Sequence, residues 1–192
     1  MQLPEALCGK LSRIKLIAMD VDGTLTDGSM IFHNGSQIKA FHAQDGLGIR
    51  LAMNFGIDVA WITGNVSDAV ADRAKRLGIE CVYQGARYKT QALSEIISNK
   101  KLDPAEIAYI GDDLNDLPAF NAVGVSIAVS DAAAEVKDAA DIVTSRSGGR
   151  GAVREAIEII LKARGQWQEA VASFLDELEK EEEARSGPEA VA

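Results

Sequence analysis

Two aspartates stand one residue apart in the segment KLIAMDVDGTLTDG, directly after a run of apolar residues. In an extended chain residues i and i+2 point the same way, so the carboxylates of Asp20 and Asp22 face one small volume, and Gly23 allows an immediate turn. Carboxylates this close repel each other unless a cation or a proton lies between them. The segment therefore indicates a cation-binding or proton-transfer site, with a simple acidic turn as the alternative. A calcium loop is excluded, because Thr24 and Ile31 stand where its third acid and closing glutamate belong.

The segment WITGN places a second set of polar groups after an apolar run. Thr63 supplies a hydroxyl, and Gly64 allows backbone amides to approach a ligand. We expect Asn65 to cap the next helix, with Asp68 in the capping-box position, so that the helix start favours an anion. Lys89 stands at the start of a later helix, where a cation opposes the helix dipole and is informative only beside an anionic site. Taken singly, these residues fit an ordinary turn and a surface lysine better than a site.

The segment YIGDDLNDLPAF holds three aspartates, Asp112, Asp113 and Asp116, after another apolar run. Helix capping would use one or two of them, and their spacing predicts that Asp112 and Asp116 share a helix face. An acid pair, a hydroxyl with free amides, a lysine and an acid cluster together describe a phosphoryl-transfer site for a hard divalent cation, with Mg²⁺ as the expected ion. The chain has no GxxxxGK[ST] loop, and its only histidines are His33 and His42, so a P-loop nucleotidase and a Ser–His–Asp hydrolase are excluded.

Buried strands that alternate with helices must position these groups. Short apolar runs predict strands at 14–19, 57–63, 79–84, 107–111 and 124–129. Helical spacing predicts helices at 45–56, 67–78, 89–101, 116–124, 132–141 and 151–165. This order is typical of an α/β fold with a doubly wound parallel sheet, whose sites lie at the carboxyl ends of the strands. One segment breaks the alternation: β-prone runs flank Asn34-Gly35 within 29–43 and predict a β-hairpin flap inserted after the first strand, with a plain surface hairpin as the alternative.

The composition limits the class of protein. The chain has 192 residues, 47% of them apolar and 26% charged, which suits one sizeable core. No run approaches the roughly 18 to 20 apolar residues that a membrane span needs. The first residues lack the basic region and apolar core of a secretory signal, and Cys8 and Cys81 are too few for a disulfide scaffold. We therefore expect a cytoplasmic protein with no membrane partner.

The net charge of −9 lies mostly in the last 27 residues. Residues 166–192 carry eight acidic and two basic side chains, so they contribute −6 and the rest of the chain −3. The absence of a basic stripe argues against a nucleic-acid partner. We expect this tail to begin as a packed amphipathic helix and to fray into a solvated end. The expected apolar stripe consists of Trp167, Val171, Phe174, Leu175 and Leu178.

The quoted motifs, in this order, resemble those of the haloacid dehalogenase (HAD) superfamily of phosphatases. DVDGT, ITG, the downstream Lys89 and GDDLND match its four motifs. FHAQDGLGI, LGIECVYQGA and GGRGAVREA resemble its small subclass without a separate cap domain, and the resemblance covers about residues 10–165. It implies a HAD-like catalytic domain over 1–165, with the hairpin flap at about 28–43, and leaves 166–192 as a C-terminal helical acidic tail.

The resemblance implies a role for each site residue. Asp20 would be the nucleophile that forms an aspartyl-phosphate, and Asp22 would protonate the leaving alkoxide and then activate water. Mg²⁺ would be held by the side chains of Asp20 and Asp112 and by the backbone carbonyl of Asp22. The other implied roles are phosphate binding by Thr63, Gly64 and Lys89, and support of metal-bound waters or of Lys89 by Asp113 and Asp116.

The subclass also implies a homotetramer that the hairpin assembles, in which a neighbouring subunit covers the active site. Arg73, and less closely Arg76, match an arginine that reaches the sugar acid of the neighbour's substrate, because a guanidinium binds a carboxylate bidentately. A solvated helix face is the alternative for both residues.

The reaction that the resemblance implies is hydrolysis of a sugar-acid phosphate monoester, 3-deoxy-D-manno-octulosonate 8-phosphate, in the synthesis of a lipopolysaccharide precursor. Members of the subclass that act on octulosonates tend to have Arg directly after the TG pair, and those that act on nine-carbon nonulosonate 9-phosphates tend to have Glu. This chain has Asn65, so a nonulosonate 9-phosphate is the alternative substrate. A catalytically silent assembly module is the alternative of another class, and the intact acids and Lys89 argue against it.

Overall fold

The computed structural model describes residues 3–186, which form one six-stranded sheet, a separate two-stranded hairpin and the helices around them. All strands of the large sheet run parallel, in the order β5-β4-β1-β6-β7-β8. The strands of this sheet are β1 (Leu16–Met19), β4 (Asp58–Ile62), β5 (Cys81–Tyr83), β6 (Ile107–Gly111), β7 (Val125–Ala128) and β8 (Ile142–Val143). The parallel α/β fold predicted from the alternation of elements is confirmed.

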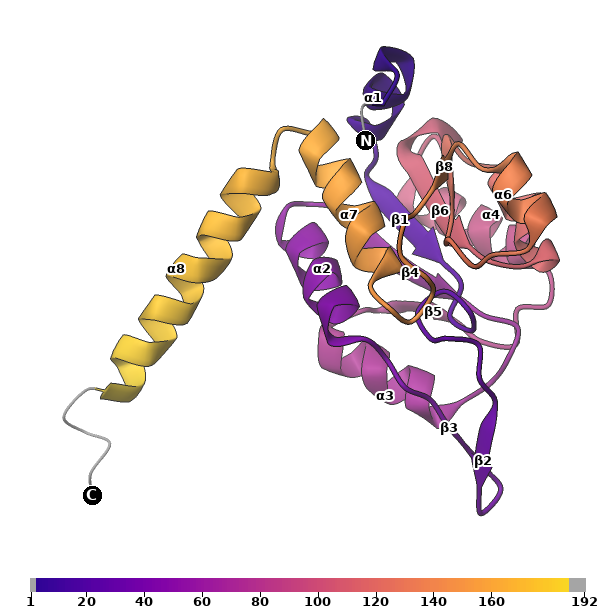
Figure 1. The fold of residues 1–192 in the computed structure, drawn as a ribbon, viewed down its shortest axis with the longest axis horizontal. Helices are drawn as coiled ribbons and strands as arrows, with labels where there is room; N and C mark the ends of the chain where they lie inside the picture. Colours follow the sequence, from indigo (N-terminus) through magenta and orange to yellow (C-terminus); the bar gives the residue numbers. More distant parts are fainter. Residues whose placement is uncertain (1–2, 187–192) are drawn as a thin grey trace.

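Helices cover both faces of this sheet (Figure 1). The helix layer of α2, α3 and α7 packs on one face, and α4, α5 and α6 pack on the other. The helices are α1 (Glu5–Leu11), α2 (Ala43–Asn54), α3 (Asp68–Leu77), α4 (Lys89–Lys100), α5 (Leu117–Phe120), α6 (Ala134–Ala139), α7 (Ala152–Ala163) and α8 (Trp167–Ser186), with 3-10 turns at Pro104–Glu106 and Leu114–Asp116. No helix between residues 3 and 186 has the length and apolar character that crossing a bilayer requires.

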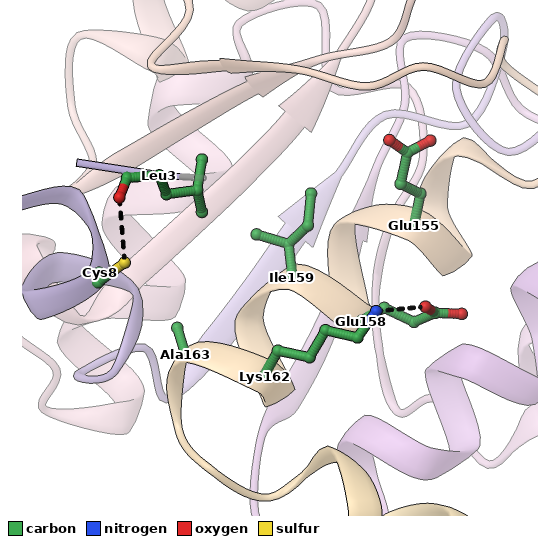
Figure 2. A pocket seen from close by; sticks show the side chains of 7 residues that line it. All are labelled: Leu3, Cys8, Glu155, Glu158, Ile159, Lys162 and Ala163. Carbon is green, nitrogen blue, oxygen red and sulfur yellow. Dashed lines mark hydrogen bonds and ion pairs between the residues drawn. The ribbon is translucent and has the colours of Figure 1, made fainter. Parts of the chain in front are cut away.

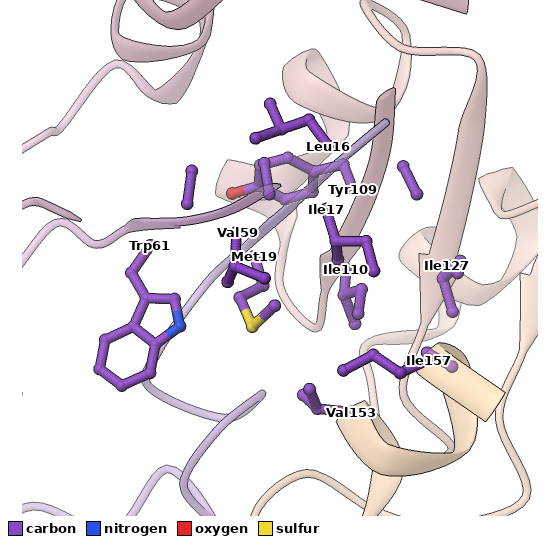
Figure 3. Packing of buried hydrophobic residues seen from close by; sticks show 14 of the residues in the cluster. Leu16, Ile17, Met19, Val59, Trp61, Tyr109, Ile110, Ile127, Val153 and Ile157 are labelled. Atoms are coloured by element: carbon purple, nitrogen blue, oxygen red, sulfur yellow. The ribbon is translucent and has the colours of Figure 1, made fainter. Parts of the chain in front are cut away.

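The central strands read as unbroken apolar runs because helices cover both of their faces. Every residue of β1 is buried, and Leu16, Ile17 and Met19 have no exposed surface. Their side chains meet those of Tyr109 and Ile110 from β6 in the core (Figure 3). A rigid core therefore fixes the ends of β1 and β6, from which the aspartates project.

The strand order reverses at β1. The chain moves from β1 outward to β4 and β5, then returns to the other side of β1 as β6 and β7. In open α/β sheets a crevice forms outside the carboxyl ends of the strands at such a switch point. Asp20 follows β1, Thr63 follows β4 and Asp112 follows β6, so the topology brings all three to this crevice.

The hairpin flap is confirmed as β2 (Ile31–His33) paired antiparallel with β3 (Ser36–Ile38). Asn34 and Gly35 at its tip both have positive φ, 49° and 80°, as the tight turn of a two-residue hairpin requires. The hairpin projects from the body of the molecule (Figure 1). Its apolar side chains Met30, Ile31, Phe32 and Ile38 are 49%, 52%, 69% and 49% exposed.

Three features differ from the sequence-based expectations. Strand β8 was not predicted, because two residues are too few to show a period. Helix α1 was not predicted either. The tail helix α8 does not fray at its charge run but stays helical to Ser186, and it contacts α2 and α7. The expected apolar stripe ends early, since Leu175 and Leu178 are 51% and 45% exposed, whereas Trp167 and Phe174 pack on the core.

Candidate active site

A buried lysine links two of the predicted aspartates. Lys89 is the first residue of α4, and its Nζ lies 3.0 Å from Oδ2 of Asp20 and 2.6 Å from Oδ1 of Asp116. The Lys89 and Asp116 side chains are 1% and 0% exposed, and that of Asp20 is 7% exposed. The lysine predicted to matter only beside an anionic site thus lies in one.

Asp112 completes the cluster from the end of β6. Its Oδ1 accepts a hydrogen bond of 2.8 Å from the hydroxyl of Thr24. Its other oxygen lies against the turn after β1: a Cβ placed on Gly23 would lie 2.0 Å from Oδ2 of Asp112. Gly23 also has a φ of +93°, so both space and backbone conformation require glycine at this position. The first motif and the fourth motif are therefore packed directly against each other.

The charges of this cluster are not balanced by protein groups alone. Burial raises the pKa of Asp20 to about 7, against the lowering effect of Lys89. Burial, followed by the charge of Asp20, raises the pKa of Asp112 to about 7. Burial lowers the pKa of Lys89, but the charges of Asp20 and Asp116 raise it by more, so the net pKa is raised and the ammonium stays charged. Carboxylate oxygens of Asp20, Asp112 and Asp116 lie within 4.8 Å of one another with this single ammonium among them, and such an oxygen-rich donor set fits Mg²⁺.

Asp116 holds Lys89 and has no capacity left for a metal ion. Its Oδ1 accepts hydrogen bonds from Lys89 Nζ and, at 2.9 Å, from the hydroxyl of Tyr109. Its Oδ2 accepts the backbone N–H groups of Asp112 and Asp113 at 3.0 and 3.3 Å. A carboxylate offers about four acceptor sites, and all are used here. Of the three clustered aspartates, Asp20 and Asp112 are therefore the ones free to bind a cation.

The prediction that Asp112 and Asp116 share a helix face is wrong. Asp112 precedes the 3-10 turn Leu114–Asp116, and Asp113 is the N-cap residue of that turn. The exposed Asp113 accepts the Leu114 N–H at 2.8 Å, while Asp116 folds back to accept the two backbone N–H groups before it. The acids do converge, but through reciprocal capping rather than through helical spacing.

The polar groups after β4 lie at the same sheet edge. Thr63 is buried at 1% exposure, its hydroxyl accepts the Asn65 N–H at 3.3 Å, and Gly64 is exposed. The prediction that Asn65 caps α3 is wrong, because Ser67 is the N-cap residue. Asn65 instead donates from Nδ2 to Oδ2 of Asp22 at 2.9 Å, which places it beside the second aspartate of the first motif.

Arg73 and Arg76 are not brought to this cluster within one chain. Arg73 lies on α3 against Gly46 of α2, and its guanidinium would lie 2.3 Å from a Cβ placed there. Arg76 is exposed in the last turn of α3. A contact with substrate in a neighbouring subunit stays a prediction for both residues.

A separate cavity of about 510 Å³ adjoins α1 and α7 (Figure 2). Glu158 within it is already paired with Arg154 at 2.9 Å and with Lys162 at 3.0 Å. Glu155 accepts hydrogen bonds from Ser145. The lining residues are Leu3, Cys8, Glu155, Glu158, Ile159, Lys162 and Ala163, which include no predicted site residue.

Sequence reasoning missed four positions at the site. Thr24 belongs to the DGT motif, and its hydroxyl could have been predicted to donate a hydrogen bond to a nearby carboxylate. Tyr109 lies in a buried strand, and a phenol there needs a polar partner. Gly148 approaches the loop after β1 so closely that a Cβ would lie 1.6 Å from the Gly23 carbonyl oxygen, and adjacent glycines are a signal for such an approach. Lys39, which forms an ion pair with Asp22, gave no sequence signal.

Residues 79–157, which include Lys89 and the fourth-motif acids Asp112, Asp113 and Asp116, match the family model of haloacid dehalogenase-like hydrolases. The 3-deoxy-D-manno-octulosonate 8-phosphate phosphatase KdsC of Escherichia coli K12 is 44% identical over 162 residues, which are 84% of this chain and 86% of the relative. The corresponding enzyme of Haemophilus influenzae is 44% identical over 158 residues, 82% of this chain and 88% of the relative.

Solved structures give the same relationship. The Moraxella catarrhalis 3-deoxy-D-manno-octulosonate 8-phosphate phosphatase, in complex with a magnesium ion, a phosphate ion and KDO, has a TM-score of 0.85 and 42% identity, covering 88% of this chain and 98% of its own. The cobalt-bound Haemophilus influenzae phosphatase has a TM-score of 0.81 and 43% identity, covering 82% and 93%. On sequence, fold and site composition together, the chain belongs to the 3-deoxy-D-manno-octulosonate 8-phosphate phosphatase family of haloacid dehalogenase-like hydrolases.

Proposed function

We propose that this protein hydrolyses 3-deoxy-D-manno-octulosonate 8-phosphate to the free sugar acid and phosphate, in a Mg²⁺-dependent reaction that serves lipopolysaccharide precursor synthesis. The observation that carries the proposal is the convergence of Asp20, Lys89 and Asp112 at the switch point of the sheet. It is supported by relatives that are 44% identical and carry this activity in their names. The protein is thus a phosphoric monoester hydrolase.

The reaction runs through two displacements at phosphorus. A carboxylate oxygen of Asp20 attacks the phosphorus, and the bond to the sugar oxygen breaks. Asp22 donates a proton to the leaving alkoxide, then takes a proton from a water that attacks the aspartyl-phosphate and releases phosphate. The Lys89 ammonium, 3.0 Å from Asp20, offsets the negative charge that the phosphoryl group brings. The hydroxyl of Thr63 and the backbone amide of Gly64 bind phosphoryl oxygens.

The carboxylates of Asp20 and Asp112 and the backbone carbonyl of Asp22 would hold the magnesium ion. When bound, Mg²⁺ supplies positive charge to the phosphoryl oxygens and to the crowded carboxylates. Thr24 keeps Asp112 oriented toward the site through its 2.8 Å hydrogen bond. Asp116 orients Lys89, and Asp113, exposed at the rim, would hold metal-bound water.

The substrate assignment is tested by steady-state kinetics with two sugar-acid phosphates. We expect kcat/KM for 3-deoxy-D-manno-octulosonate 8-phosphate to exceed that for a nonulosonate 9-phosphate by about 10²-fold or more, because a difference in size is worth roughly 10–200-fold and a lost hydrogen bond is worth more. A reversed preference makes the nine-carbon acid the substrate. Weak, equal turnover of both contradicts either assignment, and no turnover of any ester in the presence of Mg²⁺ would favour a silent assembly module.

We propose that the protein assembles as a homotetramer and is located in the cytoplasm. The exposed apolar side chains of the hairpin, with Phe32 at 69%, support a homotetramer built through residues 28–43, in which Arg73 and Arg76 reach a neighbour's substrate. Light scattering should then give about four times the mass of one chain, and a monomer would contradict it.

The free thiols of Cys8 and Cys81 support a cytoplasmic location. Residues 1–165 would be the catalytic domain and 166–192 an appended tail.

A further inference from the structure

The carboxylate of Asp22 is held from two sides. The Lys39 ammonium forms an ion pair with Oδ1, and the Asn65 side-chain amide donates to Oδ2 at 2.9 Å. The Lys39 side chain is 1% exposed and that of Asp22 is 12% exposed. A lysine this deeply buried needs a compensating charge, so its place beside Asp22 is a specific contact rather than a solvated surface pair.

The two donors come from two separate segments of the chain, and neither segment contains Asp22. Lys39 directly follows β3, at the base of the hairpin, and Asn65 lies in the loop after β4. The base of the hairpin is anchored, because Phe41 stacks on Trp61 of β4 with ring centroids 6.0 Å apart and an interplanar angle of 12°. β3 also contacts α3. The hairpin therefore presents Lys39 to the active site from a fixed position.

We infer that Lys39 and Asn65 are positioning residues that clamp the Asp22 carboxylate in the orientation needed for proton transfer. This inference rests on the proposed function, in which Asp22 serves both chemical steps. Each carboxylate oxygen has two acceptor sites, so one hydrogen bond to each oxygen still leaves a site for the transferred proton. A carboxylate held at both oxygens cannot rotate away from the leaving group, and a misplacement of about 1 Å costs roughly 10²-fold in rate.

Lys39→Met tests the clamp, because methionine keeps the length of the side chain and removes the charge. With 3-deoxy-D-manno-octulosonate 8-phosphate, whose alkoxide must be protonated, we expect kcat to fall by about 10²-fold with little change in KM. With p-nitrophenyl phosphate, whose phenolate leaves without a proton, formation of the aspartyl-phosphate stays fast and only its hydrolysis slows. Stopped-flow measurement should then show a burst of about one nitrophenolate per site that is absent from the wild-type protein.

Companion variants separate positioning from stability. Lys39→Arg should regain a part of kcat, because a guanidinium can also bond to Asp22. Asn65→Ala, at an exposed position, should give a smaller loss of the same kind, and it carries the test if Lys39→Met does not fold. The matched control is Lys100→Met, which removes the lysine of a surface pair with Asp58 (Nζ to Oδ2 2.6 Å) and should leave kcat and the absence of a burst unchanged.

The outcomes distinguish the clamp from the proposed function. If the wild-type protein is active but a folded Lys39→Met or Asn65→Ala variant keeps the wild-type kcat and shows no burst, the clamp is overturned and the proposed function is not. A rise in KM at constant kcat also overturns it, since Lys39 would then bind substrate instead. A wild-type protein inactive on every phosphate ester overturns the proposed function and the clamp with it.

Discussion

Asp20→Asn is expected to lower the rate of phosphate-ester hydrolysis by about 10⁴-fold or more, because an amide cannot replace the attacking carboxylate. The substitution preserves the shape of the side chain at a buried site. It also removes a charge that burial disfavours, since the pKa of Asp20 is raised from 3.8 to about 7. A carboxyl with a raised folded-state pKa destabilises the protein increasingly as the pH rises from about 4 to 7. At pH 8 without Mg²⁺ the variant should therefore melt no lower than the wild-type protein.

The measurement pairs steady-state kinetics with thermal melting of the same preparations. Asp27→Asn is the control: Asp27 lies in the same loop, is exposed, and pairs with Arg150 at 3.4 Å. It should change the rate by less than about threefold, as surface substitutions do. An Asp20→Asn variant that retains more than a tenth of the wild-type rate would remove the covalent mechanism from this protein.

Lys89→Met should have the largest effect on stability. Its ammonium lies between Asp20 and Asp116, and the side chains of all three are at most 7% exposed. Removal of one partner from a buried ion pair leaves uncompensated charge and costs about 3–5 kcal/mol in the free energy of unfolding. Activity should fall as well, because the phosphoryl group would meet Asp20 without a neighbouring cation.

Urea denaturation in EDTA at pH 8 measures this loss. The control is again Lys100→Met, whose exposed pair with Asp58 should contribute about 0–1 kcal/mol. Burial raises the pKa of Asp20 to about 7 even though the charge of Lys89 acts to lower it. Without Lys89 that lowering effect is lost, so the Asp20 carboxyl of the variant takes up its proton more readily. The destabilisation should therefore shrink from pH 8 to pH 5. A loss equal to that of Lys100→Met at pH 8 would show that the cluster does not depend on its lysine.

Much of the site could be predicted because topology alone gathers it. Asp20, Thr63 and Asp112 each follow an apolar run, and parallel strands bring their carboxyl ends to one edge of a sheet. Lys89 could be placed near them because it begins the helix that leads back across the sheet. The hairpin could be predicted because Asn34-Gly35 supplies the positive φ values that its turn requires.

The features that the sequence did not predict correctly depend on contacts between distant residues, which leave no trace in the local hydrophobic pattern. Asn65 fits a helix cap by type, yet α3 starts later, and the amide turns to Asp22, which lies 43 residues away in sequence. Lys39 reaches Asp22 only because the hairpin folds back over the strand end. The tail helix α8 packs on the core through Trp167 and Phe174 but leaves Leu175 and Leu178 exposed, because an amphipathic sequence pattern does not show how far the surface that covers it extends.

The central claim is that Asp20 carries the phosphoryl group between the sugar acid and water. Trapping tests it most directly: the Asp22→Ala variant is mixed with ³²P-labelled p-nitrophenyl phosphate, whose phenolate leaves without a proton, and is then quenched in acid, reduced with borohydride and digested for mass spectrometry. The account predicts labelled protein before reduction and homoserine at position 20 after it. The account would be contradicted if the wild-type protein released phosphate while neither it nor the Asp22→Ala variant became labelled. Homoserine at a position other than 20 would contradict it as well.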